Sequence, residues 1–268
     1  MKKTKRISSP STEGLSPLLF LHRLTFARRI ARRMLHGLTL RQKFHGGIIY
    51  LDAVEHSWAW TGKRRYEKFD VLLQDTMLSL SSHFKHLIDI GCNVGAMSLS
   101  VLLRNAQATA LCIDPNSRAI SLLRQSVRAN NLDTRIIVKE AAITDHDGFE
   151  CYDGAGSVTG HLSREGISVK SLDILRIVDE AALSQLCLVK IDVEGYELRL
   201  LKRLLTSKSL SKLCLVVELH PKSFNDMSDP ESALALLSES GARIRDLNRV
   251  SPASVNREEF SQVVCTWL

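Results

Sequence analysis

The segment Leu87-Ile88-Asp89-Ile90-Gly91-Cys92-Asn93-Val94-Gly95 decides the fold class of this chain. A short apolar run ends in an acid, and two glycines follow at a spacing of four. Glycine at both ends of a turn lets main-chain N–H groups approach a ligand that a Cβ atom would keep away. The segment therefore predicts a strand, a tight turn and a helix start, built around a small charged ligand.

The glycine spacing excludes two common nucleotide motifs. The pattern is G-x-x-x-G rather than G-x-G-x-x-G, so the dinucleotide-binding fingerprint is not met. No Gly-Lys-Ser/Thr follows, which excludes a phosphate-binding loop of the Walker type. Taken alone, the segment is equally compatible with an ordinary turn from a strand to a helix.

A second strand is expected at Thr109-Ala110-Leu111-Cys112-Ile113, and Asp114-Pro115-Asn116 follows it. An acid about 20 residues after the first glycine is where ribose hydroxyls are bound in nucleotide-binding folds. The alternative role for Asp114 is the N-cap of the next helix. Pro115 is expected in the first turn of that helix.

Two further strands are expected at residues 186–191 and 213–218. Both are nearly continuous apolar runs that end in acids, as buried parallel strands do. The carboxyl ends of such strands converge on the crevice where open α/β sheets bind ligands. The acids expected to line this crevice are Asp89, Asp114, Asp192 and Glu218. They suit a cationic cofactor with hydroxyl groups better than a polyphosphate.

With these residues the chain resembles the class I S-adenosylmethionine-dependent methyltransferases, and more narrowly their FkbM-like group. The narrower resemblance rests on residues 89–95, on Lys190-Ile191-Asp192-Val193-Glu194-Gly195-Tyr196-Glu197 and on Val217-Glu218-Leu219-His220-Pro221. Tyr66-Glu67 and Leu172-Asp173 give weaker support, and the resemblance covers about residues 60 to 225. It implies an α/β fold with a Rossmann-like, seven-stranded, mostly parallel sheet.

The resemblance also implies where S-adenosylmethionine binds. The first motif would hold its methionine part, Asp114 its ribose, and the chain after the third strand, at Ala141 and Ala142, would pass its adenine. Glu67 would contact the cofactor, or it would form a surface salt bridge instead. The full set expected at the cofactor is Asp89, Gly91, Cys92, Asn93, Gly95, Asp114, Ala142, Asp192 and Glu67.

The reaction implied by the resemblance is O-methylation, on a hydroxyl of a sugar, a glycan or a secondary metabolite. An alcohol acceptor must lose a proton, so a base is needed close to the methyl group. His220 is the first candidate for this catalytic base and Glu194 the second, while Asp192 is expected to orient the cofactor or the acceptor. The alternative for His220 is a structural role before Pro221.

Two other functions remain open at this level. The first is a nucleic-acid methyltransferase anchored by a basic N-terminal helix, although the sequence has no Asp/Asn-Pro-Pro-aromatic signature. The second is a non-catalytic interaction module that keeps the fold. Against the second, Asp89, Gly91, Gly95 and Asp114 are all present.

Charge divides the chain into two parts. Residues 1–45 hold eleven Lys or Arg and a single acid, Glu13, a net charge of +10 against +7 for the whole chain, which leaves −3 for residues 46–268. We therefore expect a basic extension over residues 1–45 and a methyltransferase domain over residues 46–268. The second part is long enough for one doubly wound sheet.

The extension is polar up to Leu15. Over residues 18–36, the separation of leucines and arginines onto different faces predicts a basic amphipathic helix. This helix would contact an anionic membrane surface or a nucleic acid, act as a removable transit segment, or lie on its own domain. Nucleic acid is the less expected partner. No apolar run approaches the length that a transmembrane helix needs.

The six cysteines contain no C-x-x-C pair, which favours a reducing compartment and a cytoplasmic protein, peripheral to a membrane if the helix binds one. The spacing of His and Cys shows no metal-ligand cluster, and we expect no metal site, although Asp192 and Glu218 could hold a divalent cation.

Residues 140–185 are expected to be the least regular part of the domain, with a turn at residues 145–148 and a Gly/Ser-rich loop at residues 154–160. Residues 242–245 and 263–267 are expected to form a final antiparallel strand pair.

Overall fold

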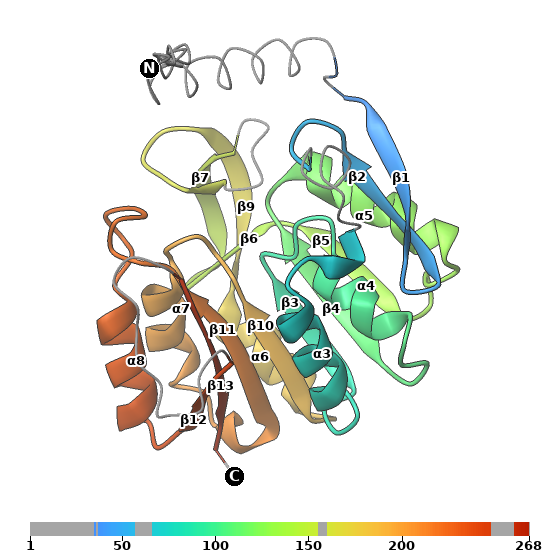
Figure 1. Ribbon diagram of the computed structural model, residues 1–268. Coiled ribbons are helices and arrows are strands. Elements are labelled where there is room, and N and C mark those ends of the chain that lie inside the picture. The colour runs from blue at the N-terminus through green and yellow to red at the C-terminus, as the bar shows by residue number, and fades with distance from the viewer. Residues whose placement is uncertain (1–34, 36, 57–65, 155–159, 248–259, 268) are drawn as a thin grey trace, which may run out of the picture.

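The computed structural model describes residues 35, 37–56, 66–154, 160–247 and 260–267 (Figure 1). Its centre is a seven-stranded sheet in the order β12-β13-β11-β10-β3-β4-β5. Strand β13 runs antiparallel to both of its neighbours, and the other pairs are parallel. The strands are β3 (His86–Ile90), β4 (Thr109–Asp114), β5 (Ile136–Glu140), β10 (Cys187–Ile191), β11 (Leu213–Leu219), β12 (Arg243–Asp246) and β13 (Ser261–Thr266). The predicted seven-stranded, mostly parallel sheet and its final antiparallel pair are confirmed.

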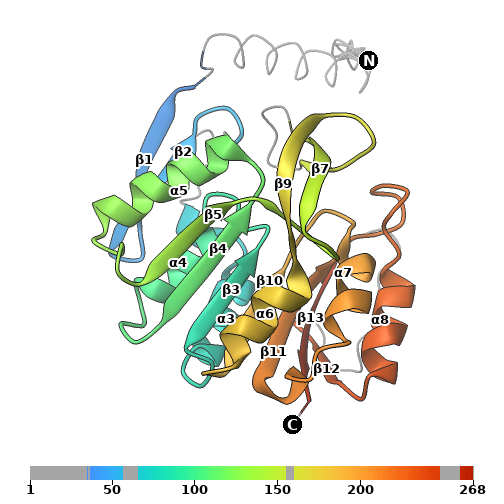
Figure 2. The same ribbon diagram turned by 180° about the vertical axis from the view of Figure 1, so that it is seen from behind.

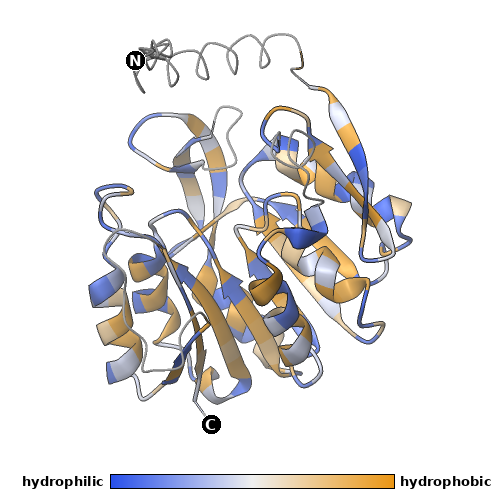
Figure 3. Ribbon diagram, in the orientation of Figure 1, coloured by the Kyte–Doolittle hydropathy of each residue, from blue (hydrophilic) through white to orange (hydrophobic). Residues whose placement is uncertain are grey.

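Helices cover both faces of this sheet (Figures 1 and 2). Helices α3 (Val71–Leu80), α4 (Ala96–Leu102) and α5 (Ser117–Ala129) pack on one face, and α6 (Ile174–Ala182), α7 (Glu197–Leu204) and α8 (Pro230–Glu239) on the other. Successive side chains of β3 alternate between the faces, with Leu87 in the first hydrophobic cluster and Ile88 in the second. Figure 3 shows the central strands as hydrophobic, as burial on both faces requires.

Helix α5 begins two residues later than predicted from an N-cap at Asp114. Its N-cap is Asn116, whose side chain accepts a hydrogen bond from the Ala119 N–H at 3.1 Å. Pro115 therefore precedes the cap instead of lying in the first helical turn, and Asp114 is free of the capping role.

A second sheet stands beyond the edge of the first and is made of residues expected to be irregular (Figure 1). Its order is β6-β9-β7-β8, with β6 (Ala142–Thr144), β7 (Gly148–Asp153), β8 (His161–Leu162) and β9 (Ile167–Asp173). This part was expected to be the least regular of the domain, and the structure corrects that expectation by the antiparallel pairing of β7 and β9 over several residues. The turn at residues 145–148 joins β6 to β7 as predicted, whereas most of the Gly/Ser-rich loop, residues 155–159, lies outside the described residues.

A hairpin of β1 (Thr39–Phe44) and β2 (Gly47–Asp52) packs on α5. The Asn130 side chain accepts from the Ile48 N–H at 2.8 Å and donates to the Ile48 carbonyl at 2.6 Å. The boundary drawn at residue 45 falls in the turn of this hairpin, and Phe44 is fully buried. The folded part therefore includes residues 39–44.

The predicted basic helix over residues 18–36 lies outside the described residues, except for Leu35. In the described ranges, none of the helices combines the length and the apolar character needed to cross a membrane. Two short 3-10 helices, η1 (Tyr66–Lys68) and η2 (Leu210–Lys212), complete the elements.

Candidate active site

The turn after β3, residues 91–95, packs closely against neighbouring parts of the protein. Gly91 and Gly95 have φ of +73° and +77°, in the left-handed region that favours glycine. A Cβ atom on Gly91 would lie 1.7 Å from the backbone oxygen of Asp192, and one on Gly95 would lie 2.4 Å from a methyl carbon of Leu123. These glycines are required because neighbouring elements approach them closely, and not only because a ligand does.

The main-chain N–H groups of this turn have partners inside the protein. Gly91 and Cys92 donate to the Ile113 carbonyl at 3.0 and 3.2 Å, and Gly95 donates to the Cys92 carbonyl at 2.8 Å. Asn93 N–H donates to Asp114 Oδ2 at 2.8 Å. The prediction that these N–H groups face a ligand is corrected: the turn instead positions the carboxylate of Asp114.

Asp114 is the acid that the turn holds at the wall of a cavity. Its two oxygens accept the N–H groups of Asn93 and Asn116, each at 2.8 Å, and its side chain lines a cavity. Burial raises its pKa to about 6, although both hydrogen bonds work in the opposite direction. A carboxylate oxygen accepts more than one hydrogen bond, so each oxygen can also receive a ribose hydroxyl.

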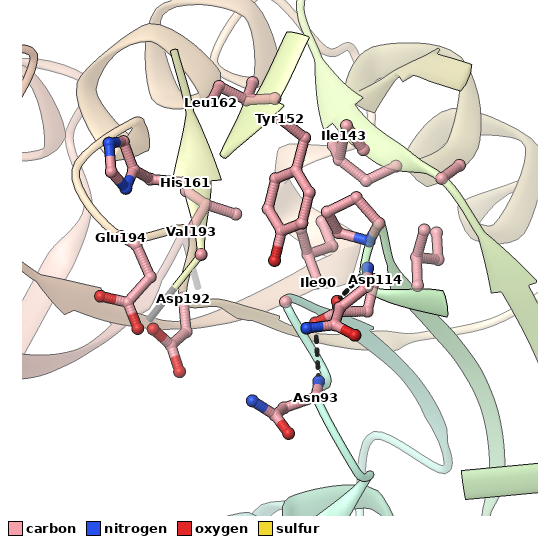
Figure 4. Close-up of a pocket in the computed structure, with 17 residues that line it drawn as sticks. Ile90, Asn93, Asp114, Ile143, Tyr152, His161, Leu162, Asp192, Val193 and Glu194 are labelled. Atoms are coloured by element: carbon pink, nitrogen blue, oxygen red, sulfur yellow. Dashed lines mark hydrogen bonds between the residues drawn. The ribbon is translucent and has the colours of Figure 1, made fainter. Parts of the chain in front are cut away.

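This first cavity lies between the carboxyl edge of the large sheet and the small sheet. Figure 4 shows Asp114 on one side of it, Asp192 and Glu194 on the other, and the Tyr152 ring between them. Ile113, Ala141, Ala142, Ile143 and Leu162 give it apolar walls. Ala141 and Ala142 thus line this cavity, and the contact with adenine stays a prediction.

Tyr152 and Leu162 are site residues that the sequence reasoning missed, because they come from β7 and β8 of the unexpected small sheet. The strand signal was present in the apolar and polar alternation of residues 149–152 next to Gly148. Burial raises the pKa of the Tyr152 phenol well above its usual value, so it stays neutral at physiological pH.

A second cavity of about 540 Å³ lies on the other side of the turn. Its walls include Tyr66, Phe69 and Phe260, whereas Lys190, Asp192, Glu194 and Glu218 give it a charged region. The residues that line both cavities are Gly91, Asn93, Asp192 and Glu194. The two cavities therefore adjoin at the turn and at the carboxyl end of β10.

Asp89 lies beneath this junction and does not line either cavity. Its side chain is fully buried, where it accepts from Ser98 Oγ at 2.6 Å and lies 3.5 Å from Lys190 Nζ. Lys190 also lies 3.0 Å from Asp192 Oδ2 and donates to the Gly91 carbonyl at 3.4 Å. The prediction that Asp89 faces the cofactor is corrected: it anchors Lys190 below the site.

Lys190 is a second group that the sequence reasoning missed. Burial opposes its charge, but the carboxylates of Asp192 and Asp89 outweigh burial and raise the pKa of the ammonium above its usual value. A lysine within an otherwise apolar strand was the available signal.

Glu67 is also placed away from the ligand cavities. Its carboxylate accepts the His45 N–H at 2.8 Å, and only its neighbour Tyr66 lines the second cavity. The cofactor contact predicted for Glu67 is therefore corrected to a structural bond with the β1–β2 turn. Cys92 does line the second cavity, and burial keeps the pKa of its thiol well above the usual range, so it is unreactive.

His220 lies among carboxylates at the end of β11. Its Nδ1 is 2.9 Å from Glu197 Oε1, and its Nε2 is 3.3 Å from Glu194 Oε2, 3.8 Å from Glu218 and 4.0 Å from Asp192. Burial lowers the pKa of the imidazole, but the bonds to Glu194 and Glu197 outweigh burial and raise it to about 11. An imidazole with this pKa holds both of its protons at neutral pH, which argues against the prediction that His220 is the base.

Glu194 and Glu218 differ in their surroundings. Burial and the charge of Asp192 raise the pKa of Glu218 to about 8, and Gln262 Nε2 donates to its Oε2 at 2.8 Å. Glu194 lies in the left-handed region at φ +54° and lines both cavities. Of the three predicted catalytic residues, Asp192 and Glu194 lie at the junction of the cavities, and His220 lines neither cavity. Asp192 is bound by the buried Lys190, whereas Glu194 is not in contact with that lysine.

The sequence of residues 67–151 matches the family model described as the methyltransferase small domain. The fold is that of the class I methyltransferases. S-adenosylmethionine is the cofactor of these methyltransferases, and the match includes the turn and Asp114. It ends before β10 and β11, so membership of the FkbM-like group stays a prediction.

Solved structures with a similar fold include an O-methyltransferase family protein from Burkholderia thailandensis, at 10% identity and a TM-score of 0.42 over 93% of this chain and 71% of that one. TYW2 from P. horikoshii in complex with MeSAdo is 15% identical, with a TM-score of 0.45 over 94% of this chain and 84% of that one. The M. jannaschii tRNA m1G37 methyltransferase is 14% identical, with a TM-score of 0.44 over 85% and 54%. No curated protein matches the chain significantly.

Proposed function

We propose that this protein transfers a methyl group from S-adenosylmethionine to a hydroxyl of a sugar, a glycan or a secondary metabolite. The observation that supports this most is the junction of the two cavities at Asp192 and Glu194. A methyl donor in the first cavity and an acceptor in the second would meet there.

The first cavity fits the nucleoside part of the cofactor. Asp114 offers ribose hydroxyls a carboxylate that two backbone N–H groups hold in place, and the apolar wall around Ala142 suits an adenine ring. When bound, S-adenosylmethionine supplies a sulfonium methyl group that is already electrophilic. The protein then has to align an acceptor oxygen and remove its proton.

Glu194 is the base in this proposal. It lines both cavities, so its carboxylate is within reach of an acceptor hydroxyl at their junction. Asp192 instead orients the ligands, because Lys190 holds its Oδ2 at 3.0 Å. The His220 ring, whose Nε2 lies 3.3 Å from Glu194 Oε2, holds that carboxylate in position.

The other expectations remain proposals of lower rank. The nucleic-acid methyltransferase and the membrane contact both depend on the basic helix over residues 18–36, which lies outside the described residues. A cytoplasmic location is consistent with six free cysteines.

The test of the cofactor is a calorimetric titration of the purified chain with S-adenosylmethionine. We expect saturable binding, weakened at least about tenfold by Asp114→Ala, since a hydrogen bond to a charged group contributes about 1.5–3 kcal/mol. Asp75→Ala, which removes a largely exposed acid outside both cavities, is the matched control and should bind as the wild type does. Absence of saturable binding to the intact chain would remove the proposal and favour the interaction module.

The test of the base is Glu194→Gln. Methyl transfer to a hydroxylated acceptor should fall by about a hundredfold or more, while affinity for S-adenosylmethionine changes little. Equal loss of turnover and of cofactor affinity would place Glu194 in the cofactor site instead.

A further inference from the structure

The ends of β10 and β11 bring three potential metal ligands together at the second cavity. Asp192, Glu218 and His220 each offer one ligand atom, and these atoms lie within 4.8 Å of one another. They come from a strand end and from the next strand along the sheet, so the parallel register of the strands brings them together.

The imidazole is fixed by a carboxylate on its far side. Only 5% of the His220 residue is exposed, and its Nδ1 lies 2.9 Å from Glu197 Oε1. Its Nε2 then faces the cluster of acids, with Glu194 Oε2 at 3.3 Å, Glu218 Oε1 at 3.8 Å and Asp192 Oδ1 at 4.0 Å. Metal-binding histidines are usually held by such a carboxylate through the ring nitrogen that does not bind the ion.

In each of the two carboxylates, one oxygen accepts a hydrogen bond from a residue that is not a potential ligand. Lys190 Nζ lies 3.0 Å from Asp192 Oδ2, and Gln262 Nε2 donates to Glu218 Oε2 at 2.8 Å. The oxygens that remain, Asp192 Oδ1 and Glu218 Oε1, are the ones that face the imidazole. All three ligand atoms are therefore oriented by partners that are not ligands themselves.

Acidic side chains around this point outnumber the two basic ones, Lys190 and His220. The carboxylates of Asp192, Glu194 and Glu218 all lie within 4.0 Å of a single imidazole nitrogen. Glu197 adds a fourth on the other side of the ring. A divalent cation in place of the proton on Nε2 would balance these charges better than that proton does.

We propose that Asp192 Oδ1, Glu218 Oε1 and His220 Nε2 bind a divalent metal ion at the charged wall of the second cavity. One imidazole and two carboxylates suit first-row ions such as Mn²⁺, Fe²⁺ or Zn²⁺. Three protein ligands leave coordination positions open toward the cavity. This revises the expectation of no metal, which was based on the spacing of His and Cys alone.

Its link to catalysis rests on the proposed function. An acceptor hydroxyl bound to the ion would lose its proton more readily, and the proton would pass to the Glu194 carboxylate. Glu194 is therefore left out of the ligand set and keeps its role as the base.

The experiment is a titration of the metal-free, full-length protein with Mn²⁺, followed by calorimetry and by electron paramagnetic resonance of the free ion. We expect one Mn²⁺ per chain, and at least about tenfold weaker binding by Asp192→Asn and by Glu218→Gln. Glu231→Gln, an exposed acid of α8 outside both cavities, is the matched control and should bind as the wild type does.

Two readouts keep the result decisive. Circular dichroism checks that each variant is folded, and pulsed resonance on the wild-type complex should show coupling to an imidazole nitrogen, which needs no variant. Absence of Mn²⁺ binding, or binding without that coupling and unchanged in both variants, would overturn the proposal. A parallel titration with S-adenosylmethionine separates the failures: Mn²⁺ binding without cofactor binding would refute the proposed function alone, and the reverse would refute the metal site alone.

Discussion

The acidic residues of the two adjoining cavities are held in place by different kinds of groups. In the first, Asp114, the acid proposed to bind the ribose, is held by backbone N–H groups from the turn and from Asn116, and most of the remaining wall is apolar. In the second, charged side chains hold one another: Lys190 lies between Asp89 and Asp192, and His220 lies among carboxylates.

The difference determines what each cavity is sensitive to. A carboxylate fixed by the main chain keeps its place when neighbouring side chains change, so the first cavity depends on the path of the backbone. A cluster of buried charges is balanced only as a whole, so loss of one member leaves the others uncompensated. Gly91 lines both cavities, so it lies between the acid held by the backbone and the cluster of charged side chains.

Gly91→Ala should have the largest effect on stability. The new Cβ atom would lie 1.7 Å from the Asp192 backbone oxygen, at a φ of +73°. Left-handed backbone and overpacking each cost about 1–3 kcal/mol, so we expect unfolding free energy to fall by about 4 kcal/mol. Urea denaturation measures this.

Gly46→Ala is the matched control for that substitution. Gly46 has a φ of +81°, but nothing lies within 4 Å of a Cβ atom placed there. Only the backbone cost of about 1 kcal/mol should remain. Equal losses of unfolding free energy in the two variants would show that the turn does not pack tightly against the end of β10. The backbone around the first cavity would then not constrain the second cavity.

His220→Gln should cause the next largest loss of unfolding free energy, because it removes a buried cation from among carboxylates. Breaking a buried ion pair costs about 3–5 kcal/mol, and we expect about 3 kcal/mol at pH 6. The pKa of His220 is raised from 6.5 to about 11. The stabilisation is therefore complete below pH 6.5 and is lost as the pH rises through 11, so the deficit of the variant should be smaller at pH 9 than at pH 6.

The control is His146→Gln, at a histidine that lies 3.0 Å from Asp145 but whose side chain is 48% exposed. Exposed pairs contribute about 0–1 kcal/mol, so this variant should change unfolding free energy little at either pH. A deficit of the His220 variant that does not change between pH 6 and pH 9 would contradict the imidazolium assignment.

The parts of the fold that the sequence predicted correctly are those that local patterns encode. Strands β3, β4, β10 and β11 are buried on both faces, so each is a continuous apolar run that ends at the edge where ligands bind. Asp114 and Asp192 were placed at the cavities for the same reason. The small sheet was not predicted, because its strands are short and partly exposed, as the 74% exposure of Phe149 shows.

The chemical state of individual groups could not be predicted from local sequence. Asp89 and Asp114 both end apolar runs, yet one contacts a buried lysine and the other accepts backbone N–H groups from two segments. The proton on His220 depends on Glu194 and Glu197, which precede it in the chain by more than twenty residues. Such charge balances are set by the assembled tertiary structure.

The first cavity should respond to pH through Asp114, the acid proposed to bind the ribose. Its pKa is raised to about 6, and the ionised carboxylate is the form that accepts both ribose hydroxyls. At pH 5 only about a tenth of it is ionised, so affinity for S-adenosylmethionine should fall about tenfold from pH 7 to pH 5. Calorimetry at both pH values tests this, with Asp114→Asn as the control that should bind weakly and equally at both. A wild-type affinity that is flat over this range would show that another group binds the ribose.

Glu67→Gln should have the smallest effect of these changes. The side chain accepts the His45 N–H at 2.8 Å, and a glutamine amide oxygen can accept the same bond. Unfolding free energy should therefore fall by less than about 1 kcal/mol. Affinity for S-adenosylmethionine should stay within about twofold, because Glu67 lines neither cavity while its neighbour Tyr66 lines the second. A tenfold loss of cofactor affinity, with stability unchanged, would show that Glu67 turns toward the ligand on binding. The cofactor site would then depend on a charged side chain as well as on the backbone, and the contrast between the two cavities would no longer hold.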